Sequence, residues 1–255
     1  MSTRQKAEES AVVAGKPQCD AAFIPLWGPV RVLVTAFGAF PGAPSNPTEH
    51  VVKRLRLHYR RRFALQHIDV VTAAMPVRFE GVAARITALL NAHRPDIVIH
   101  LGLAGRRETL SVETRALNRL TSIHTDETRV LSGTTTVLPG GEAVRRARWA
   151  AVPLAIAMSR RGAPTRISID AGDYLCNQTL YLTLGLFDGP TGFIHMPRLR
   201  RRLKTRAEPL RRSTKPSLQA ATEAIAAAIE QCTVDFRREY SGATIRRLDP
   251  VASLP

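Results

Sequence analysis

Cysteine is scarce in this sequence. The 255 residues include 3 cysteines, Cys19, Cys176 and Cys232, which are odd in number, far apart and without a CxxC pair. This spacing argues against a disulfide framework and against a structural zinc site. It fits a reduced intracellular environment in which one thiol is free to carry chemistry.

Long hydrophobic runs are also missing. No stretch approaches the ~18 uninterrupted apolar residues that a membrane-spanning helix needs. Near the N-terminus, the apolar run Ala11–Ala14 is short and is bounded by Glu9 and Lys16, so it lacks the form of a secretory signal. We therefore expect a soluble, cytoplasmic protein that does not enter a membrane.

Acidic residues are heavily outnumbered. The chain has 37 Lys+Arg against 21 Asp+Glu, a formal net charge of +16, with the densest basic block at 197–212. Such a block can bind phosphates, although basic runs are more often solvated loops. No nucleic-acid-reading module accompanies it, and no aromatic residues are interleaved for base stacking. We therefore do not expect a nucleic acid as the partner.

Short apolar runs alternate with amphipathic stretches from Arg31 onward. The runs predict strands at 31–37, 68–76, 96–102, 166–172 and 192–197. The amphipathic stretches predict helices beginning at Asn46-Pro47 and spanning 78–93, 153–161, 174–187 and 217–232. This alternation predicts an α/β fold of three layers (α/β/α), phosphorylase/hydrolase-like, with a mainly parallel twisted sheet and helices on both faces.

The domain organisation follows from the same pattern. Residues 1–30 have no sustained period and are expected to be a flexible extension. Residues 31–235 are expected to form a single catalytic domain, followed by a C-terminal tail at 236–255. Within the domain, the Thr/Gly-rich stretch Glu108–Ala143 is expected to consist of hairpins and loops.

Candidate catalytic residues come from the predicted strand ends. Ligands of a parallel α/β sheet meet the carboxyl ends of the strands, which places Cys176 and His195 at one rim. Cys176 falls in the first turn of a helix, where unpaired amides stabilise a thiolate and can hold an oxyanion. By position alone, a buried structural Cys and a core His are the commoner outcomes. Position also leaves the acid open among four carboxylates near strand ends: Glu108, Glu113, Asp170 and Asp173.

Five stretches, in order, resemble a known family. They are VLVTAFGAFPGAPSNPTEHVV, DIVIHLGLAGRRETLSVETRALN, the segment ending in AGDYLCNQTLYLTL, TGFIHMP, and KPSLQAATEAIAAAI. Together they are similar to pyroglutamyl-peptidase I, the cysteine peptidase (omega peptidase) family that removes N-terminal pyroglutamate. The resemblance runs from about Val32 to Cys232, and the combination of AGDYLCN with GFIH is its most specific part.

The resemblance implies roles for individual residues. It makes Cys176 the nucleophile, His195 the general base and then acid, and Glu113 the group that orients the imidazole. It also implies a pocket for the lactam ring, with the substrate-binding residues Phe37, Phe40, Tyr174 and Leu175. Neither a metal nor another cofactor is implied. The expected partners are peptides with an N-terminal pyroglutamate and further copies of the chain, as a dimer or tetramer.

Some positions depart from the family pattern. Gln178 stands where the family usually has His, and Ile123 aligns with an arginine that members carry near the active site. The block 197–212 is also more basic than the usual turn. These changes leave the three catalytic residues in place and alter their surroundings. The alternative is therefore a divergent thiol hydrolase, or an inactive member of the scaffold, with changed specificity.

Overall fold

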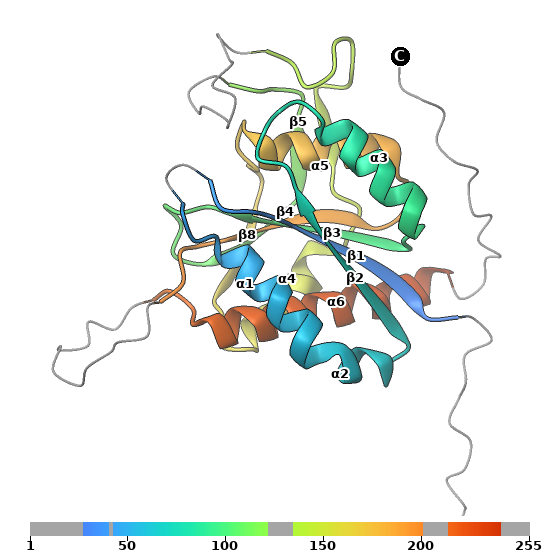
Figure 1. Ribbon diagram of the computed structural model, residues 1–255, viewed down its shortest axis with the longest axis vertical. Coiled ribbons are helices and arrows are strands. Elements are labelled where there is room, and N and C mark those ends of the chain that lie inside the picture. Colours follow the sequence, from blue (N-terminus) through green and yellow to red (C-terminus); the bar gives the residue numbers. More distant parts are fainter. Residues whose placement is uncertain (1–27, 41–42, 122–134, 201–213, 241–255) are drawn as a thin grey trace, which may run out of the picture.

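A mixed sheet forms the centre of the protein. The computed structural model describes residues 28–40, 43–121, 135–200 and 214–240, and these form a six-stranded sheet in the order β2-β1-β3-β8-β4-β7 (Figure 1). The strands are β1 (Val30–Phe37), β2 (Ile68–Met75), β3 (Ile97–Leu103), β4 (Leu110–Glu113), β7 (Thr165–Ser168) and β8 (Thr191–Met196). The first four strands in that order are parallel, whereas β4 runs antiparallel to β8 and parallel to β7. The predicted mainly parallel sheet is confirmed.

Helices cover both faces of the sheet (Figure 1). One face carries α1 (Pro47–Arg54), the π-helical segment η1 (Leu55–Tyr59), α2 (Arg60–Ala64), α4 (Ala151–Ser159) and α6 (Leu218–Tyr240). The other face carries α3 (Val82–His93) and α5 (Leu175–Leu186). A small antiparallel pair, β5 (Arg115–Leu117) and β6 (Val144–Arg146), lies beside α5. The predicted three-layer arrangement is therefore correct.

The alternation of side chains along each strand builds two cores. In β8, Ile194 packs with the α4/α6 cluster, whereas its neighbour Phe193 packs with the α3/α5 cluster. Successive side chains of a strand point to opposite faces, so a strand between two helical layers must be apolar on both sides. This requirement explains why the central strands read as continuous apolar runs.

Local signals fix several element ends. Asn46 caps α1 as predicted, because its side chain accepts a hydrogen bond from the amide of Thr48 at 3.1 Å and Pro47 occupies the first helical position. Gly81 begins α3 with a φ of 81°, a conformation that a residue with a Cβ adopts at a cost. These caps determine where the two helices start relative to β1 and β2.

Two predictions about local structure are wrong. The stretch Glu108–Ala143 is not only loops and hairpins, since it contains β4, which lies inside the sheet with its residues buried on both sides. Only four residues long, β4 is too short to be distinguished from a loop by its periodicity. Helix α6 continues to Tyr240, beyond the expected end at Cys232, and Phe236 joins the core.

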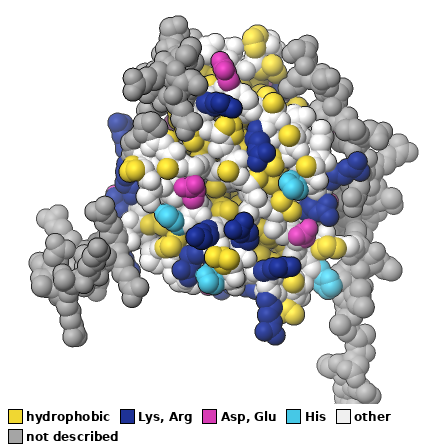
Figure 2. Space-filling model, viewed as in Figure 1, with side chains coloured by type: hydrophobic (Ala, Val, Ile, Leu, Met, Phe, Trp, Pro, Cys, Tyr) yellow, Lys and Arg dark blue, Asp and Glu magenta, His cyan; other side chains and the backbone are white. Residues whose placement is uncertain are grey.

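The remaining expectations about the chain ends and surface are tested only in part. Most of the predicted extension and tail lies outside the described residues, although Val30 starts β1 and residues 236–240 continue α6. Figure 2 shows Lys and Arg side chains spread across one face, with acidic side chains sparser. Within the described residues, no helix is long and apolar enough to cross a membrane.

Candidate active site

The predicted nucleophile lies at the start of a helix. Cys176 is the second residue of α5, after Tyr174 at the N-cap, and is partly buried against the α3/α5 cluster. The first hydrogen bond of the helix runs from the amide of Gln178 to the carbonyl of Tyr174 at 3.0 Å. The Tyr174 side chain makes no capping hydrogen bond to the first turn. The amides around Cys176 thus point out of the helix end, where a carbonyl oxygen that gains negative charge can be held.

Burial and the position at a helix N-terminus have opposite effects on the pKa of the Cys176 thiol. The pKa of Cys176 is raised to about 12, mainly because burial removes the thiol from water and also because the Glu113 carboxylate lies nearby. Arg107 acts in the opposite direction. The low thiol pKa expected from the helix position is therefore not found, because removing the charged form from water outweighs the effects of Arg107 and of the backbone hydrogen bond, which lower the pKa. The thiol needs a base to take its proton.

A histidine and a buried carboxylate form the second part of the site. Nδ1 of His195 lies 2.7 Å from Oε1 of Glu113, and the Glu113 side chain is 0% exposed. An ionised carboxylate only accepts hydrogen bonds, so Nδ1 carries the proton and donates it. This assignment leaves the lone pair of a neutral imidazole on Nε2, the nitrogen that can accept a proton from a nucleophile.

The pairing of β3 with β8 places the thiol and the imidazole near the same residue, Gly102. His195 pairs with Gly102 in the β3–β8 ladder. A Cβ atom on Gly102 would lie 2.8 Å from Sγ of Cys176 and 2.5 Å from Cζ of Phe193. The sulfur therefore rests on the backbone of the residue beside His195, in space that only a glycine leaves open.

The chain reaches this arrangement by a route that differs from the predicted one. We expected Cys176 and His195 to meet because Cys176 follows one predicted strand, His195 ends another, and the carboxyl ends of these strands share a rim. Strand β7 is parallel to β4, which is antiparallel to β8, so the carboxyl ends of β7 and β8 point in opposite directions. Segment 169–174 instead leads from the end of β7 to the start of α5, and α5 then runs back to β8.

The structure distinguishes among the four carboxylates that sequence position left open. Glu108 is exposed, with Lys215 at 3.3 Å and a hydrogen bond from Thr214. Asp170 is also exposed and accepts the amide of Gly172 at 2.9 Å. Asp173 contributes its backbone carbonyl to the amide of Thr121. Of these four described carboxylates, Glu113 is the one that contacts the imidazole.

Two further residues support the site and were not singled out from the sequence. Arg107 donates to Oε1 of Glu113 at 2.6 Å and to the carbonyl of Asp170 at 2.7 Å. Asn177, fully buried, holds the backbone of β5 with hydrogen bonds to both the amide and the carbonyl of Leu117 at 2.8 Å. Both residues lie within the stretches that resemble the family, but only the folded chain shows which groups they contact.

The four predicted pocket residues join one apolar cluster with Cys176. Phe37 and Leu175 are buried within it, whereas Phe40 and Tyr174 pack at its margin and stay partly exposed. The Tyr174 ring makes an edge-to-face contact with Phe79, at 5.1 Å between centroids. Aromatic surface therefore lies beside the start of α5.

The structure describes some of the positions that depart from the family pattern and leaves others outside the described residues. Gln178, which replaces the usual His, is buried and donates to the carbonyl of Phe79 at 3.2 Å. Ile123 and the larger part of the basic block 197–212 lie outside the described residues. Among the residues that the structure places, no group of three or more His, Cys, Asp or Glu could hold a metal ion.

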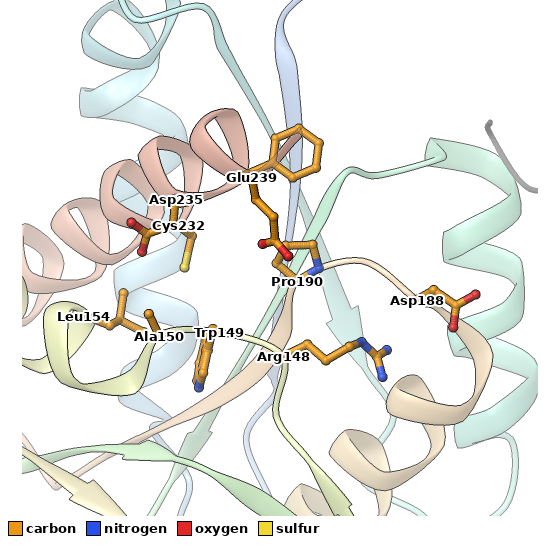
Figure 3. A pocket seen from close by; sticks show the side chains of 10 residues that line it. Arg148, Trp149, Ala150, Leu154, Asp188, Pro190, Cys232, Asp235 and Glu239 are labelled. Carbon is orange, nitrogen blue, oxygen red and sulfur yellow. The ribbon is translucent and has the colours of Figure 1, made fainter. Parts of the chain in front are cut away.

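A separate cavity of about 340 Å³ lies on the opposite face of the sheet (Figure 3). Cys232, Asp235 and Glu239 of α6 face the segment around Trp149, with Pro190 beside them. Leu154, Cys232 and Phe236 in its lining belong to the α4/α6 cluster, whereas Cys176 packs with the α3/α5 cluster. The cavity is therefore separated from the thiol by the sheet and takes no part in the candidate active site.

Comparisons with known proteins find relatives over most of the described chain. A family model described as pyroglutamyl peptidase matches residues 30–234. The pyrrolidone-carboxylate peptidase of Pyrococcus furiosus is 32% identical over 176 residues, covering 66% of this chain and 81% of that relative. Among solved structures, the pyrrolidone carboxyl peptidase of Thermus thermophilus matches with a TM-score of 0.67 and 29% identity, over 78% of this chain and 99% of that one. The pyroglutamyl peptidase I of Bacillus amyloliquefaciens matches with a TM-score of 0.68 and 25% identity, over 80% of this chain and 97% of the other.

Proposed function

This chain belongs to the pyroglutamyl peptidase family, and from that premise we propose that it hydrolyses the amide bond after an N-terminal pyroglutamyl residue. The observation that carries the proposal is the 2.7 Å contact between Nδ1 of His195 and the buried Glu113, beside a cysteine at a helix start. A thiol, a base and a group that orients the base are the minimum equipment for nucleophilic acyl transfer.

The proposed reaction begins with proton transfer. Nε2 of His195 takes the proton of the Cys176 thiol as Sγ attacks the pyroglutamyl carbonyl carbon. The carbonyl oxygen becomes an oxyanion, which the amides at the start of α5 stabilise. When the tetrahedral intermediate collapses, the carbon–nitrogen bond breaks and the leaving amine takes the proton from His195. Water, deprotonated by His195, then attacks the thioester, releasing pyroglutamate and regenerating the thiol.

The state of the thiol supports this order of events. Because burial and Glu113 raise the pKa of Cys176 to about 12, the thiol is neutral at neutral pH. A preformed thiolate would leave His195 already protonated. In this site, proton transfer instead accompanies attack, so the tautomer set by Glu113 is needed in the first chemical step.

The proposed pocket fits an uncharged acyl group. Pyroglutamate is a lactam without a free amine, so its site needs apolar walls and a few hydrogen-bonding groups. The aromatic residues Phe37, Phe40 and Tyr174 lie in or against the same cluster as Cys176, and Leu175 packs directly before the nucleophile. We assign these four side chains to the wall around the lactam ring.

The location and assembly of the protein are part of the proposal. A cytoplasmic location is supported by the free thiols of Cys176 and Cys232, which a reducing compartment preserves. A dimer or tetramer is supported by large apolar side chains exposed on α4 and the neighbouring edge strand β7, including Ile156 and Ile167. Residues 31–235 form the proposed catalytic unit.

Release of a fluorophore from a pyroglutamyl amide tests the function. The purified full chain under reducing conditions is compared with Cys176→Ala and, as a matched cysteine control, Cys232→Ala. We expect turnover in the parent and in Cys232→Ala, and no turnover in Cys176→Ala. A parent that releases no fluorophore would contradict the pyroglutamyl assignment and favour the divergent or inactive alternative. Activity that survives in Cys176→Ala would refute the assigned nucleophile.

A further inference from the structure

Arg107 joins two parts of the site that come from distant segments of the chain. It lies in the turn between β3 and β4, where its amide donates to the carbonyl of Ala104 at 2.9 Å. Its guanidinium donates through Nη1 to Oε1 of Glu113 at 2.6 Å and through Nη2 to the carbonyl of Asp170 at 2.7 Å. The side chain is 18% exposed, so water competes weakly for these contacts.

The first contact supplies a permanent counter-charge to a buried carboxylate. Glu113 is 0% exposed, and its ion-pair partners are Arg107 and His195. His195 must be neutral to act as a base, and it then compensates no charge. A buried carboxylate without a counter-charge is costly, whereas a guanidinium stays protonated throughout a catalytic cycle. Arg107 therefore supplies a counter-charge to Glu113 whether or not His195 holds a second proton.

Among the described residues, Arg107 is the one permanently charged donor to the Glu113 carboxylate. Within the described part of the chain, both side-chain donors to Glu113, Nδ1 of His195 and Nη1 of Arg107, contact Oε1, and no donor contacts the buried Oε2. Without Arg107, the carboxyl group would be held by His195 alone and could rotate about its last bond. The direction of the imidazole then depends on the group that fixes Oε1 in place.

The second contact reaches the segment that precedes the nucleophile. Asp170 lies in segment 169–174, which leads from β7 to the start of α5. Another arginine, Arg115, holds the same segment by donating from Nε to the carbonyl of Ile169 at 2.7 Å. Within the described residues, Arg115 makes no hydrogen bond to Glu113, so the two arginines share the loop contact but differ in the carboxylate contact. The chain thus offers a matched control.

We propose that Arg107 is a positioning residue that locks the Glu113 carboxylate and the segment before Cys176 into one geometry, thereby aligning His195 with the nucleophile. This inference rests on the proposed function for its catalytic consequence. The electrostatics point the same way, because Arg107 lowers the pKa of Cys176 while burial and Glu113 raise it. The charged and titratable groups around the thiol are Glu113 from β4, Arg107 from the β3–β4 turn, and His195 from β8 beside Gly102.

Steady-state kinetics on the full chain provide the first test. The variants are Arg107→Gln, Arg107→Lys and the control Arg115→Gln, assayed with a pyroglutamyl amide that releases a fluorophore. We expect Arg107→Gln to lower kcat about 100-fold, with KM changed less than about threefold, because alignment rather than substrate binding is lost. Arg107→Lys retains the charge without the two-pronged geometry and should recover about tenfold of that loss. Arg115→Gln should lower kcat less than about fivefold, the effect of a single loop hydrogen bond.

The second test is the rate at which iodoacetamide alkylates Cys176 across a pH series. The pH dependence of this rate would not change if the substitution only loosened the loop. Mass spectrometry of the peptides distinguishes Cys176 from Cys19 and Cys232. In Arg107→Gln we expect the rise in alkylation rate to shift to higher pH, with the profiles of Arg107→Lys and Arg115→Gln unchanged. Coincident profiles for Arg107→Gln and the parent would overturn the proposal.

The kinetic results also distinguish a positioning role of Arg107 from a simple loop contact. Equal kcat losses in Arg107→Gln and Arg115→Gln would show that the contact with Glu113 is not used. Full activity in Arg107→Lys would show that the two simultaneous contacts of the guanidinium are not needed. Either result refutes the proposal. Should Arg107→Gln fail to fold, the comparison of Arg107→Lys with Arg115→Gln still decides it. If the parent releases no fluorophore, the proposed function fails, and the alkylation profiles, which need no substrate, decide the role of Arg107 independently.

Discussion

A buried histidine outside the candidate active site predicts a specific loss of stability in acid. His100 in β3 is 1% exposed, with Nδ1 2.6 Å from the hydroxyl of Thr35 and Nε2 2.9 Å from that of Thr183. The Thr183 hydroxyl donates its single proton to the carbonyl of Thr179 at 2.8 Å. Nε2 must therefore carry the imidazole proton, and Nδ1 accepts one from Thr35. The neutral ring satisfies both nitrogens.

The sign and size of the effect follow from the pKa of this ring. Desolvation lowers the pKa of His100 from 6.5 to about 3 in the folded protein. Above pH 6.5 the ring is neutral in both the folded and unfolded chains; as pH falls below that value, only the unfolded chain takes up the proton. The stability associated with the neutral ring is thus lost progressively between about pH 6.5 and pH 3. Between about pH 7.5 and pH 5, this linkage amounts to about 2 kcal/mol.

The assay is urea unfolding of the parent and His100→Gln at the two pH values. The other histidines are present in both proteins, so their contributions cancel in the comparison. The variant should be less stable near neutrality by about 1–3 kcal/mol, because a threonine hydroxyl loses its partner. It should also lose about 2 kcal/mol less than the parent on acidification. Equal losses in the two proteins, or NMR resonances of His100 that titrate near pH 6, would refute this reasoning.

Two further substitutions test the packing of the site. Gly102→Ala places a Cβ 2.5 Å from the Phe193 ring and 2.8 Å from the sulfur of the nucleophile, so we expect a loss of about 1–3 kcal/mol in urea unfolding together with reduced turnover. Gly28→Ala, which has nothing within 4 Å, is the control, and equal behaviour of the two would contradict the steric argument. Asn177→Ala removes the hydrogen bonds to the β5 backbone and should cost about 3 kcal/mol, because buried backbone groups lose their partners. A loss below about 1 kcal/mol would mean that water replaces the amide.

Much of the fold could be predicted because it depends on local patterns. The apolar runs of β1, β3 and β8 are long enough to identify, since strands covered on both faces must be apolar throughout. The start of α1 follows from Asn46 and Pro47 alone. Strand β4 was missed because its four residues carry too few positions to show a period, and its place in the sheet depends on pairing with β7 and β8.

The candidate site was predictable in part. Cys176 and His195 could be proposed from their places near the ends of predicted strands, but the reasoning about a shared rim was wrong because β7 is antiparallel to β8. Glu113 could not be chosen by position among four carboxylates, and only the resemblance selected it. Arg107 gave no signal, because one arginine in a sequence rich in them is indistinguishable until its contacts are known.

The sequence by itself determined the alternation of strands and helices, the capped start of α1 and the residues that carry the family resemblance. Each of these depends on neighbours within a few positions of the chain. The tertiary structure alone decided the reversed direction of β4 and β7, the meeting of Glu113 with His195 across 82 positions, and the burial that raises the pKa of the thiol. Strand pairing and desolvation depend on which distant segments exclude water together, and no local pattern encodes that.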